Sequence, residues 1–275
     1  MQIYQLTNCT FVQMMGYIIK TDSGKVIVID GGGRGQSPEL YRVLKQVGDH
    51  VDMWFLTHSH NDHYVSIMEL FREHPEITVE GLWRSNCDTP DVVAAMPEAE
   101  RKELEEWLAF EKETTVPLYD LHMWQKFTVD SVEIEVLGIH NPEILVNNSN
   151  NQSVVLKITE GAFSMLFLGD LGVEGGEKLL KNAGDKVCST AVQMAHHGQR
   201  GVAREVYEKI QATYAFWPTP IWLWNNTATL EDAFNTGPYD TRRTVGWMEE
   251  LGTVNITSFD NSIVFDTKTK TAETV

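Results

Sequence analysis

The sequence predicts an α/β fold in a single domain that spans residues 1–275, with a helical insertion around residues 86–126. Apolar runs typical of β-strands alternate with helical patterns along the chain, and this alternation is typical of α/β folds. No low-complexity segment or evident linker divides the sequence. With 275 residues, of which 42% are hydrophobic and 10% aromatic, the chain can bury one large core or two modest ones.

The N-terminal part begins with two short β-branched runs, residues 16–20 and 25–30, which are separated by turn residues. This pattern predicts a β-hairpin. A helix is expected at residues 37–47, because Ser37 can cap it, a proline follows in the first turn, and apolar residues then recur with helical spacing. The apolar run at residues 51–57 predicts a strand that is buried on both faces.

The segment at residues 86–126 differs in composition from the rest of the chain and interrupts the rhythm of strands. Pro97 and the glutamates after it predict an acidic helix, whose apolar side carries Leu104, Trp107 and Leu108. We expect this segment to lie over the core as an insertion.

The C-terminal part continues the alternation of strands and helices. Strands are expected at residues 132–137, 154–159, 163–168, 190–195 and 212–217, with one or two closing strands within residues 253–265. Helices are expected around residues 177–182, 202–210 and 241–251. This order of elements again favours one α/β domain.

The formal net charge of −17 narrows the partners that the chain is expected to have. A surface that is so acidic repels phosphate backbones, so we do not expect binding to polymeric nucleic acid. A small-molecule substrate is expected instead. No pattern in the sequence indicates an oligomeric state.

Cysteine usage and the N-terminal sequence favour a cytoplasmic location. Cys9, Cys87 and Cys188 lie at wide and unpatterned spacing, which predicts neither a disulfide framework nor a zinc site built from cysteines. The first residues show no signal-peptide pattern. No apolar stretch approaches the roughly 20 residues that a membrane helix needs, so we expect no association with a membrane.

The sequence THSHNDH at residues 57–63 is the strongest functional signal in the chain. It places His58, His60, Asp62 and His63 directly after an apolar run. Imidazole nitrogen and carboxylate oxygen are ligands that Zn²⁺, Mn²⁺ and Fe²⁺ accept, and four of them together can begin two adjacent sites. A polar loop that is rich in histidine by chance is the alternative, but three of the nine histidines of the chain fall here. The cluster therefore predicts a metal site.

These residues form a His-x-His-x-Asp-His motif, and with it the sequence resembles the metallo-β-lactamase superfamily. Residues 16–20 and 25–32 are similar to the first hairpin of that superfamily and its Asp-Gly turn. Asp170, after a glycine, is similar to the next carboxylate of the family, and residues 194–198 to a later histidine. The resemblance covers nearly the whole chain except residues 86–126, and it implies a four-layer αβ/βα sandwich with a dinuclear metal site.

Within the superfamily, the sequence is most similar to the branch that contains the hydrolase domain of ComEC-type DNA-uptake proteins. The asparagine-rich turn at residues 150–156 resembles a turn of that branch, and a His-His-Gly sequence after a strand is also typical of it. Two features depart from the pattern. Residues 64–66, Tyr-Val-Ser, replace the two glycines that usually follow the first motif, and the asparagine-rich turn occupies the place of the usual third histidine of the first metal site.

The resemblance and the chemistry of these donors imply two divalent metal ions, with zinc as the first choice and manganese or iron as alternatives. Two such ions lower the pKa of a shared water, and the hydroxide would attack a carbonyl carbon or a phosphorus atom. Besides acting as a ligand, Asp62 would orient this nucleophile. The expected ligands are His58 and His60 for one ion, Asp62, His63 and His196 for the other, and Asp170 as the bridge.

Further roles follow from the same resemblance. Asn150, or Asn151 in its place, would be a weak ligand or an outer hydrogen-bond donor. Either His196 or His197 is expected to be the metal ligand, with His196 preferred. His197 and His140 would then protonate a leaving group or steady a ligand.

The aromatic run FWPTPIWLW near the C-terminus permits two interpretations. It packs in the core and continues into a proline-stiffened loop, or it lines the substrate site, since tryptophan rings stack on other rings and bind cations. In the second case Trp222 and Trp224 would contact the substrate, together with Tyr64 and Arg200. Asp30, by contrast, is expected to be an ordinary turn residue.

These inferences predict a metal-dependent hydrolase that uses a metal-bound hydroxide at a dinuclear site. A small phosphodiester or a related phosphoester is the expected substrate, from the branch resemblance and from two-metal chemistry. One alternative is the hydrolysis of a carbonyl compound such as a lactone, a thioester or a β-lactam. The other is a non-catalytic binding module with a degenerate metal site, which the absent third histidine and the missing glycines leave open.

Overall fold

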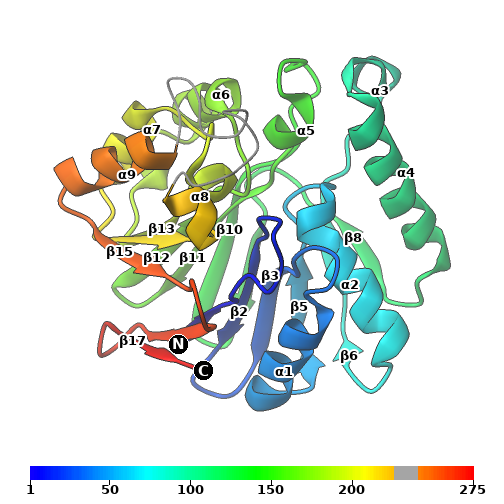
Figure 1. The fold of residues 1–275 in the computed structure, drawn as a ribbon, viewed down its shortest axis with the longest axis horizontal. Helices are drawn as coiled ribbons and strands as arrows, with labels where there is room; N and C mark the ends of the chain where they lie inside the picture. Colours follow the sequence, from blue (N-terminus) through cyan, green and yellow to red (C-terminus); the bar gives the residue numbers. More distant parts are fainter. Residues whose placement is uncertain (226–240) are drawn as a thin grey trace.

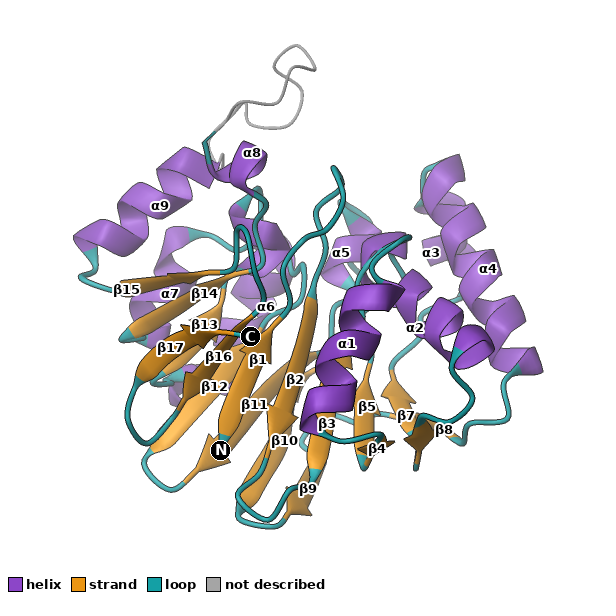
Figure 2. Cartoon of the chain, turned by 60° about the horizontal axis from the view of Figure 1, so that its bottom comes forward, coloured by secondary structure: helices purple, strands orange, loops and turns teal. Residues whose placement is uncertain are grey.

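The computed structural model describes residues 1–225 and 241–275, in which two large mixed β-sheets form the centre of the molecule. One set of helices packs on the outer face of each sheet, so the described chain has four layers in the order helix, sheet, sheet, helix (Figure 1 and Figure 2). The predicted four-layer α/β sandwich is therefore confirmed.

The first sheet combines an antiparallel and a parallel part. In spatial order, its described strands are β17 (Thr271–Thr274), β16 (Ile263–Asp266), β1 (Gln2–Gln5), β2 (Gly16–Lys20), β3 (Val26–Asp30), β5 (Met53–Phe55), β7 (Leu82–Arg84) and β8 (Leu118–Asp120). The pairs from β17 to β3 are antiparallel, whereas β3, β5, β7 and β8 pair in parallel. The predicted hairpin is confirmed as β2 and β3.

The second sheet has the same mixed character. In spatial order, its described strands are β15 (Val254–Thr257), β14 (Tyr214–Trp217), β13 (Ala191–Gln193), β12 (Phe163–Phe167), β11 (Val155–Glu160), β10 (Val132–Gly138) and β9 (Lys126–Val129). The strands from β9 to β12 are antiparallel, and those from β12 to β15 are parallel. A separate parallel pair consists of β4 (His50–Val51) and β6 (Thr78–Val79).

The helices lie on the two outer faces and at the end of the sandwich that carries the site. They are α1 (Ser37–Val47), α2 (Asn61–Glu73), α3 (Pro90–Ala95), α4 (Glu98–Glu113), α5 (Asn148–Asn151), α6 (Val173–Ala183), α7 (Arg204–Ile210), α8 (Ile221–Trp224) and α9 (Thr241–Glu250), with 3₁₀ turns at Gly184–Val187 and Ala195–Gly198. Figure 1 shows α1, α2 and α4 on one side, and α6, α7 and α9 on the other. Among the described residues, none of these helices combines the length and the apolar character that crossing a bilayer requires.

Three buried clusters hold the layers together. The largest side chains between the two sheets include Tyr17 of β2 and Phe167 of β12, whose rings meet edge to face with centroids 5.2 Å apart. A second cluster joins the first sheet to α1, α2 and α4, where Trp54 and Trp107 are fully buried. The third joins the second sheet to α6, α7 and α9 around Trp217. The central strands of both sheets, such as β3, β5, β12 and β13, are thus buried on both faces, as continuous apolar strands require.

The structure corrects two local predictions. The helix begins at Ser37, but Ser37 does not cap it, because Gln36 is the N-cap residue and makes no side-chain cap bond. The Gln36 side chain instead binds the backbone of Thr7 and Cys9. The strand predicted at residues 51–57 is divided into β4 and β5, since Asp52 bends away and accepts a hydrogen bond from the amide of Val26.

The predicted insertion at residues 86–126 contains α3 and α4, but it also contains β8. Because β8 pairs with β7, this part of the segment extends the first sheet. The helical part is therefore shorter than expected. The division of the chain into one domain with an insertion stays a prediction.

Candidate metal centre

The predicted metal motif lies where β5 leads into α2. His58 is in the loop, His60 is the N-cap residue of α2, and the other two residues of the motif lie in its first turn. The amides of Gly31 and Gly32 donate hydrogen bonds to the carbonyl oxygen of His63, and these bonds hold the first turn of α2 against the end of β3. A Cβ atom at position 31 would lie 2.7 Å from Cγ1 of Ile67, so glycine permits this close approach.

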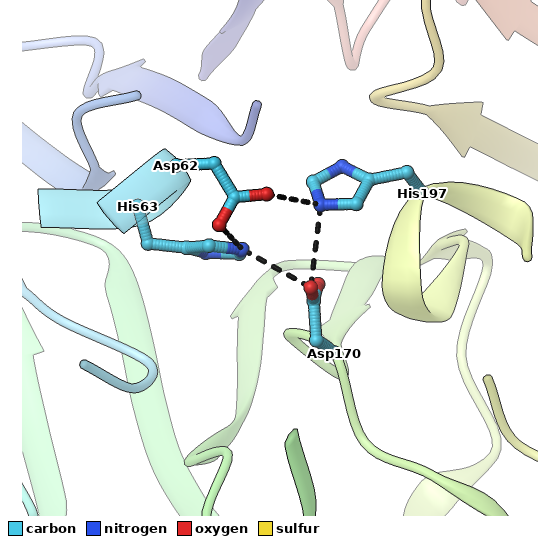
Figure 3. A group of neighbouring side chains, drawn as sticks. All are labelled: Asp62, His63, Asp170 and His197. Atoms are coloured by element: carbon cyan, nitrogen blue, oxygen red, sulfur yellow. Dashed lines mark ion pairs between the residues drawn. The ribbon is translucent and has the colours of Figure 1, made fainter. Parts of the chain in front are cut away.

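We call the first set of potential ligands the Asp62 group; it consists of Asp62, His63, Asp170 and His197. All four residues are buried, and one ligand atom of each lies within 4.8 Å of the others. His197 Nε2 is 3.2 Å from both Asp62 Oδ2 and Asp170 Oδ2, and His63 Nε2 is 3.2 Å from Asp170 Oδ2 (Figure 3). The group therefore joins the first turn of α2 to residues that follow β12 and β13 in the second sheet.

Outer hydrogen bonds turn the two imidazoles of the Asp62 group inwards. His63 Nδ1 lies 2.7 Å from Asp30 Oδ2, and His197 Nδ1 lies 2.9 Å from the carbonyl oxygen of Pro218. A hydrogen-bond acceptor next to Nδ1 favours the tautomer in which Nδ1 carries the ring proton. Nε2 then has a free lone pair with which it can bind a metal ion. The carboxylate of Asp30 is itself held by the amide and the hydroxyl of Thr57, at 2.7 and 2.8 Å.

The inward-facing atoms fit a divalent cation. Nε2 of His63, Nε2 of His197 and Oδ1 of Asp170 are buried and have no hydrogen-bond partner among the described residues. Buried polar atoms are nearly always satisfied, and here the histidine nitrogens have only their ion pairs with the carboxylates at 3.2 Å, so the convergence of these atoms leaves room for a shared cation. Two carboxylates and two imidazoles are a donor set that zinc, manganese and iron accept.

We call the second set the His58 group; it consists of His58, His60 and Asp170. His58 Nε2 lies 3.1 Å from His60 Nδ1 and 3.9 Å from Asp170 Oδ2. His60 is less enclosed than the rest, with 15% of its side chain exposed. Asp170 thus belongs to both groups, which makes them neighbours that share one carboxylate.

His58 differs in charge from the imidazoles of the Asp62 group when no ion is bound. Burial disfavours a charged His197, but the neighbouring carboxylates outweigh it and raise the pKa of His197 to about 9. Against the same effect of burial, Asp170 and Asp30 raise the pKa of His63 well above its ordinary value. Burial and the adjacent imidazoles instead lower the pKa of His58 well below its ordinary value, so this ring is neutral at pH 7.

The structure favours the opposite assignment of the histidine pair at residues 196 and 197. His197 is fully buried and belongs to the Asp62 group, whereas His196 is 17% exposed and lies 4.0 Å from Asp170 Oδ2. Both residues have positive φ angles, 51° and 54°, so the backbone turns sharply between them and sends the two rings in different directions. The structure thus places His197, and not the preferred His196, among the buried potential ligands, and which of the two binds an ion stays a prediction.

The two asparagines of the asparagine-rich turn differ in their contacts. Asn150 faces the site: its Nδ2 lies 3.5 Å from His196 Nε2, and its Oδ1 is buried without a hydrogen-bond partner among the described residues. Asn151 is used elsewhere, because its Oδ1 accepts hydrogen bonds from the amides of Gly172 and Gly175 at the start of α6. The contacts therefore favour Asn150 over Asn151, and a ligand role for either stays a prediction.

His140 and Tyr64 lie outside both groups. His140 Nδ1 is 2.6 Å from Ser85 Oγ, on the wall of a cavity of about 310 Å³ that also involves Leu171 and Lys178. Tyr64 is completely buried beneath α4, where its hydroxyl donates to the carbonyl oxygen of Glu103. The prediction that Tyr64 contacts the substrate is wrong, because the side chain packs in the core.

The aromatic run near the C-terminus is mostly core. Trp224 packs edge to face on Trp217, with ring centroids 5.0 Å apart, which supports the first of its two interpretations. Trp222 is half-buried in the same short helix, α8, and Arg200 is exposed. Neither residue belongs to the metal-binding groups, so their contact with a substrate stays a prediction.

Sequence reasoning missed two carboxylates. Asp30 is an outer partner of His63 and not an ordinary turn residue; a carboxylate at the end of an apolar strand needs a buried partner, and this was the available signal. Glu100, in the first turn of α4, has its Oε2 atom 3.8 Å from His60 Nε2. No local pattern marks Glu100 among the neighbouring glutamates of α4.

A model of the metallo-beta-lactamase superfamily matches residues 6–215 of the chain. Among curated proteins, hydroxyacylglutathione hydrolase of Salmonella arizonae is 34% identical over 68 residues, which are 24% of this chain and 25% of that enzyme. The corresponding enzyme of Salmonella paratyphi B matches to the same extent. The chain therefore matches only 25% of the length of these relatives, in one short stretch.

Two solved structures have a similar fold over almost the whole chain. The metallo-beta-lactamase fold protein YhfI of Bacillus subtilis is 11% identical, with a TM-score of 0.57 over 97% of this chain and 100% of that chain. CmlA, a diiron beta-hydroxylase of Streptomyces venezuelae, is 12% identical, with a TM-score of 0.57 over 100% of this chain and 54% of that chain. At these identities the likeness concerns the fold alone. Since the family model covers most of the sequence, including the motif and Asp170, the chain belongs to the metallo-beta-lactamase superfamily, as a hydrolase with a buried metal-binding cluster of histidine and aspartate.

Proposed function

We propose that the chain hydrolyses a small phosphodiester or a related phosphoester with two divalent metal ions, zinc being the first choice. The observation that carries this proposal is the position of Asp170. Its Oδ2 atom lies 3.2 Å from Nε2 of His63 and of His197, and 3.9 Å from His58 Nε2. One carboxylate that belongs to two adjacent donor groups suits the paired ions of phosphatases and nucleases.

Under this proposal, the Asp62 group holds one ion. The His58 group holds the other, with Asn150 as a weak ligand or an outer hydrogen-bond partner. Such ions, when bound, activate a water nucleophile at neutral pH and stabilise negative charge on phosphoryl oxygens. The protein keeps the donor atoms in place through Asp30 and the Pro218 carbonyl oxygen, so that little reorganisation is needed on binding.

Asp62 and His196 are the residues that we propose to act on water and substrate. Asp62 would orient the nucleophile, because its carboxylate points from the first turn of α2 towards the other potential ligands of the Asp62 group. His196 lies at the edge of the site next to Asn150 and Asp170, and it would take the role that was expected for His197. Burial lowers the pKa of His196, so its neutral ring can donate one N–H to a substrate oxygen or accept a proton.

The size and setting of the substrate are inferred from the sequence. The net charge of −17 favours a small substrate over polymeric nucleic acid. The asparagine-rich turn and the His-His-Gly sequence support membership of the ComEC-type branch. We also propose a cytoplasmic location, which rests on the number and spacing of the cysteines.

A second candidate function is the hydrolysis of a thioester or another carbonyl compound. Two observations favour it. The short stretch that resembles hydroxyacylglutathione hydrolases links the chain to enzymes whose name indicates such a substrate. The carboxylate of Glu100 near His60 adds negative charge beside the His58 group, which disfavours an anionic phosphoester.

The two functions can be separated with a panel of substrates. The chain would be purified without chelator, loaded with Zn²⁺ or Mn²⁺, and assayed on bis-p-nitrophenyl phosphate, a glutathione thioester, a lactone and nitrocefin. We expect turnover of the phosphodiester, and Asp62→Ala and His60→Ala should abolish it while the circular dichroism spectrum stays unchanged. Turnover of a thioester or lactone alone would reject the phosphodiester and establish the second candidate. Metal content below one ion per chain, without rescue by added ions, would reject both.

A further inference from the structure

We infer that Glu100 of α4 is a positioning residue for His60, and that α4 is therefore a working part of the metal centre. This inference rests on the proposed metal site. It concerns which nitrogen of His60 is free to bind an ion, and what keeps it free.

The orientation of His60 is the first step. Its Nδ1 atom lies 3.1 Å from His58 Nε2, so Nδ1 faces the interior of the His58 group. Its Nε2 atom points the other way, towards Glu100 Oε2 at 3.8 Å. If Nδ1 is the atom that binds, Nε2 must carry the ring proton and needs an acceptor. That Nε2 atom is buried and has no hydrogen-bond partner among the described residues.

The other three imidazoles show what His60 is missing. His63 has the carboxylate of Asp30 at its outer nitrogen, His197 has the carbonyl oxygen of Pro218, and His58 Nδ1 lies 3.1 Å from Thr57 Oγ1. Each of these outer atoms is within hydrogen-bond distance. Glu100 stands in the same relation to His60, and a shift of about 1 Å would convert the ion-pair distance into a hydrogen bond.

Glu100 is held in this place from two sides. Ser149 of α5 donates a hydrogen bond from Oγ to Glu100 Oε2. The residue also lies in the first turn of α4, where the helix dipole favours a negative charge. The next acidic residue on this face, Glu103, is engaged by the amide and side chain of Asn61 and does not compete for His60.

The helix that supplies Glu100 is fixed by packing. Trp107 of α4 is completely buried, and the centroid of its ring lies 5.4 Å from the ring centroid of Tyr64 of α2. Because Tyr64 follows the metal motif directly, α4 is docked on the same helix that presents His60. The position of Glu100 relative to His60 is thus set by a core contact and not by a free surface loop.

The test compares three variants of the full chain. Glu100→Gln removes the charge with little change in shape, Ser149→Ala releases the Glu100 carboxylate, and Glu105→Gln changes an exposed glutamate of the same helix as a matched control. Two properties would be measured. One is the dissociation constant of each Zn²⁺ ion by competition with a chelator. The other is the tautomer of His60 in the metal-free protein by ¹⁵N NMR of the imidazoles.

We expect Glu100→Gln to weaken the binding of one ion by about 10–100-fold and to leave the other unchanged, since this is the usual effect of losing an outer partner. The fraction of His60 with its proton on Nε2 should fall. Ser149→Ala should shift both properties in the same direction by less, and Glu105→Gln should shift neither.

Unchanged zinc affinities and an unchanged His60 tautomer in Glu100→Gln would overturn the inference, even if the wild-type chain binds two ions. If the wild-type chain binds no metal, the proposed function fails, but the tautomer of His60 still tests the role of Glu100. Should Glu100→Gln fold poorly, the smaller change in Ser149→Ala decides, because it leaves α4 itself intact.

Discussion

The Asp62 group and the His58 group share Asp170, yet they are built differently. The Asp62 group has four buried donors, and both of its imidazoles have an outer acceptor within 2.9 Å. The His58 group has three donors, one of them partly exposed, and its outer acceptor for His60 lies 3.8 Å away. Opposite charges hold the first group together without an ion, whereas His58 in the second is neutral. A shared ligand therefore does not give the two sites the same affinity, and we expect the Asp62 group to bind its ion more tightly than the His58 group.

The largest effect is expected from the residue that both groups use. Asp170→Asn should cost both ions, because the amide lacks the negative charge that faces His63 and His197. Activity should fall by about 10²–10³-fold or more, the range for removing a preorganised electrostatic group. Metal analysis and steady-state kinetics check this. If the variant still bound two ions per chain, the two groups would not share this carboxylate.

Variants of the adjacent His196 and His197 should differ in the number of ions that they bind. His197→Asn should remove the ion of the Asp62 group and nearly all activity, while His196→Asn should retain both ions and lose mainly turnover. The reason is that only His197 lies 3.2 Å from two carboxylates. Isothermal titration with Zn²⁺ measures the number of sites in each variant. Loss of an ion from the His196 variant alone would restore the original preference for His196.

The outer partner of His63 should matter less than the ligands themselves. Asp30→Asn places an amide N–H₂ or a neutral oxygen beside Nδ1 of His63, so the inward tautomer loses its strong acceptor. We expect zinc affinity of the Asp62 group to fall by about 10–100-fold. Chelator competition measures this change, and Asp260→Asn, an exposed site, is the control. Equal weakening of both ions would show that Asp30 acts on general stability and not on His63.

The smallest effect concerns pH. The pKa of His197 is raised from 6.5 to about 9 in the folded metal-free protein, so its contribution to stability is fully present below pH 6.5 and is lost as the pH rises through about 9. One pKa unit corresponds to about 1.4 kcal/mol, so the free energy of unfolding should fall by a few kcal/mol over this interval. Urea titrations of the metal-free chain between pH 6 and 10 measure it. A His197→Gln variant should show a smaller decline, because His63, whose pKa is also raised, still contributes. A flat profile in the wild-type chain would contradict the ion-pair description of the Asp62 group.

Much of the fold could be predicted because its elements are local patterns. The hairpin of β2 and β3, helix α1 and the position of Asp170 after β12 all follow from apolar periodicity and turn residues. Other features depend on the assembled structure. Two consecutive positive φ angles determine that His197, and not His196, turns into the Asp62 group. No residue type at these positions indicates such angles. Glu100 reaches His60 only because α4 docks on α2, a contact between segments about 40 residues apart.

The Asp62 group draws Asp62 and His63 from the element after β5 and its other two residues from loops after β12 and β13. An ion bound to this group would cross-link the two halves of the sandwich, and its site is complete only when both halves have assembled. Metal loading would then report that folding is complete, and the bound form would gain stability in proportion to the logarithm of the free metal concentration. Removal of the ion by a chelator would therefore weaken the contact between the two sheets before it destabilised either sheet.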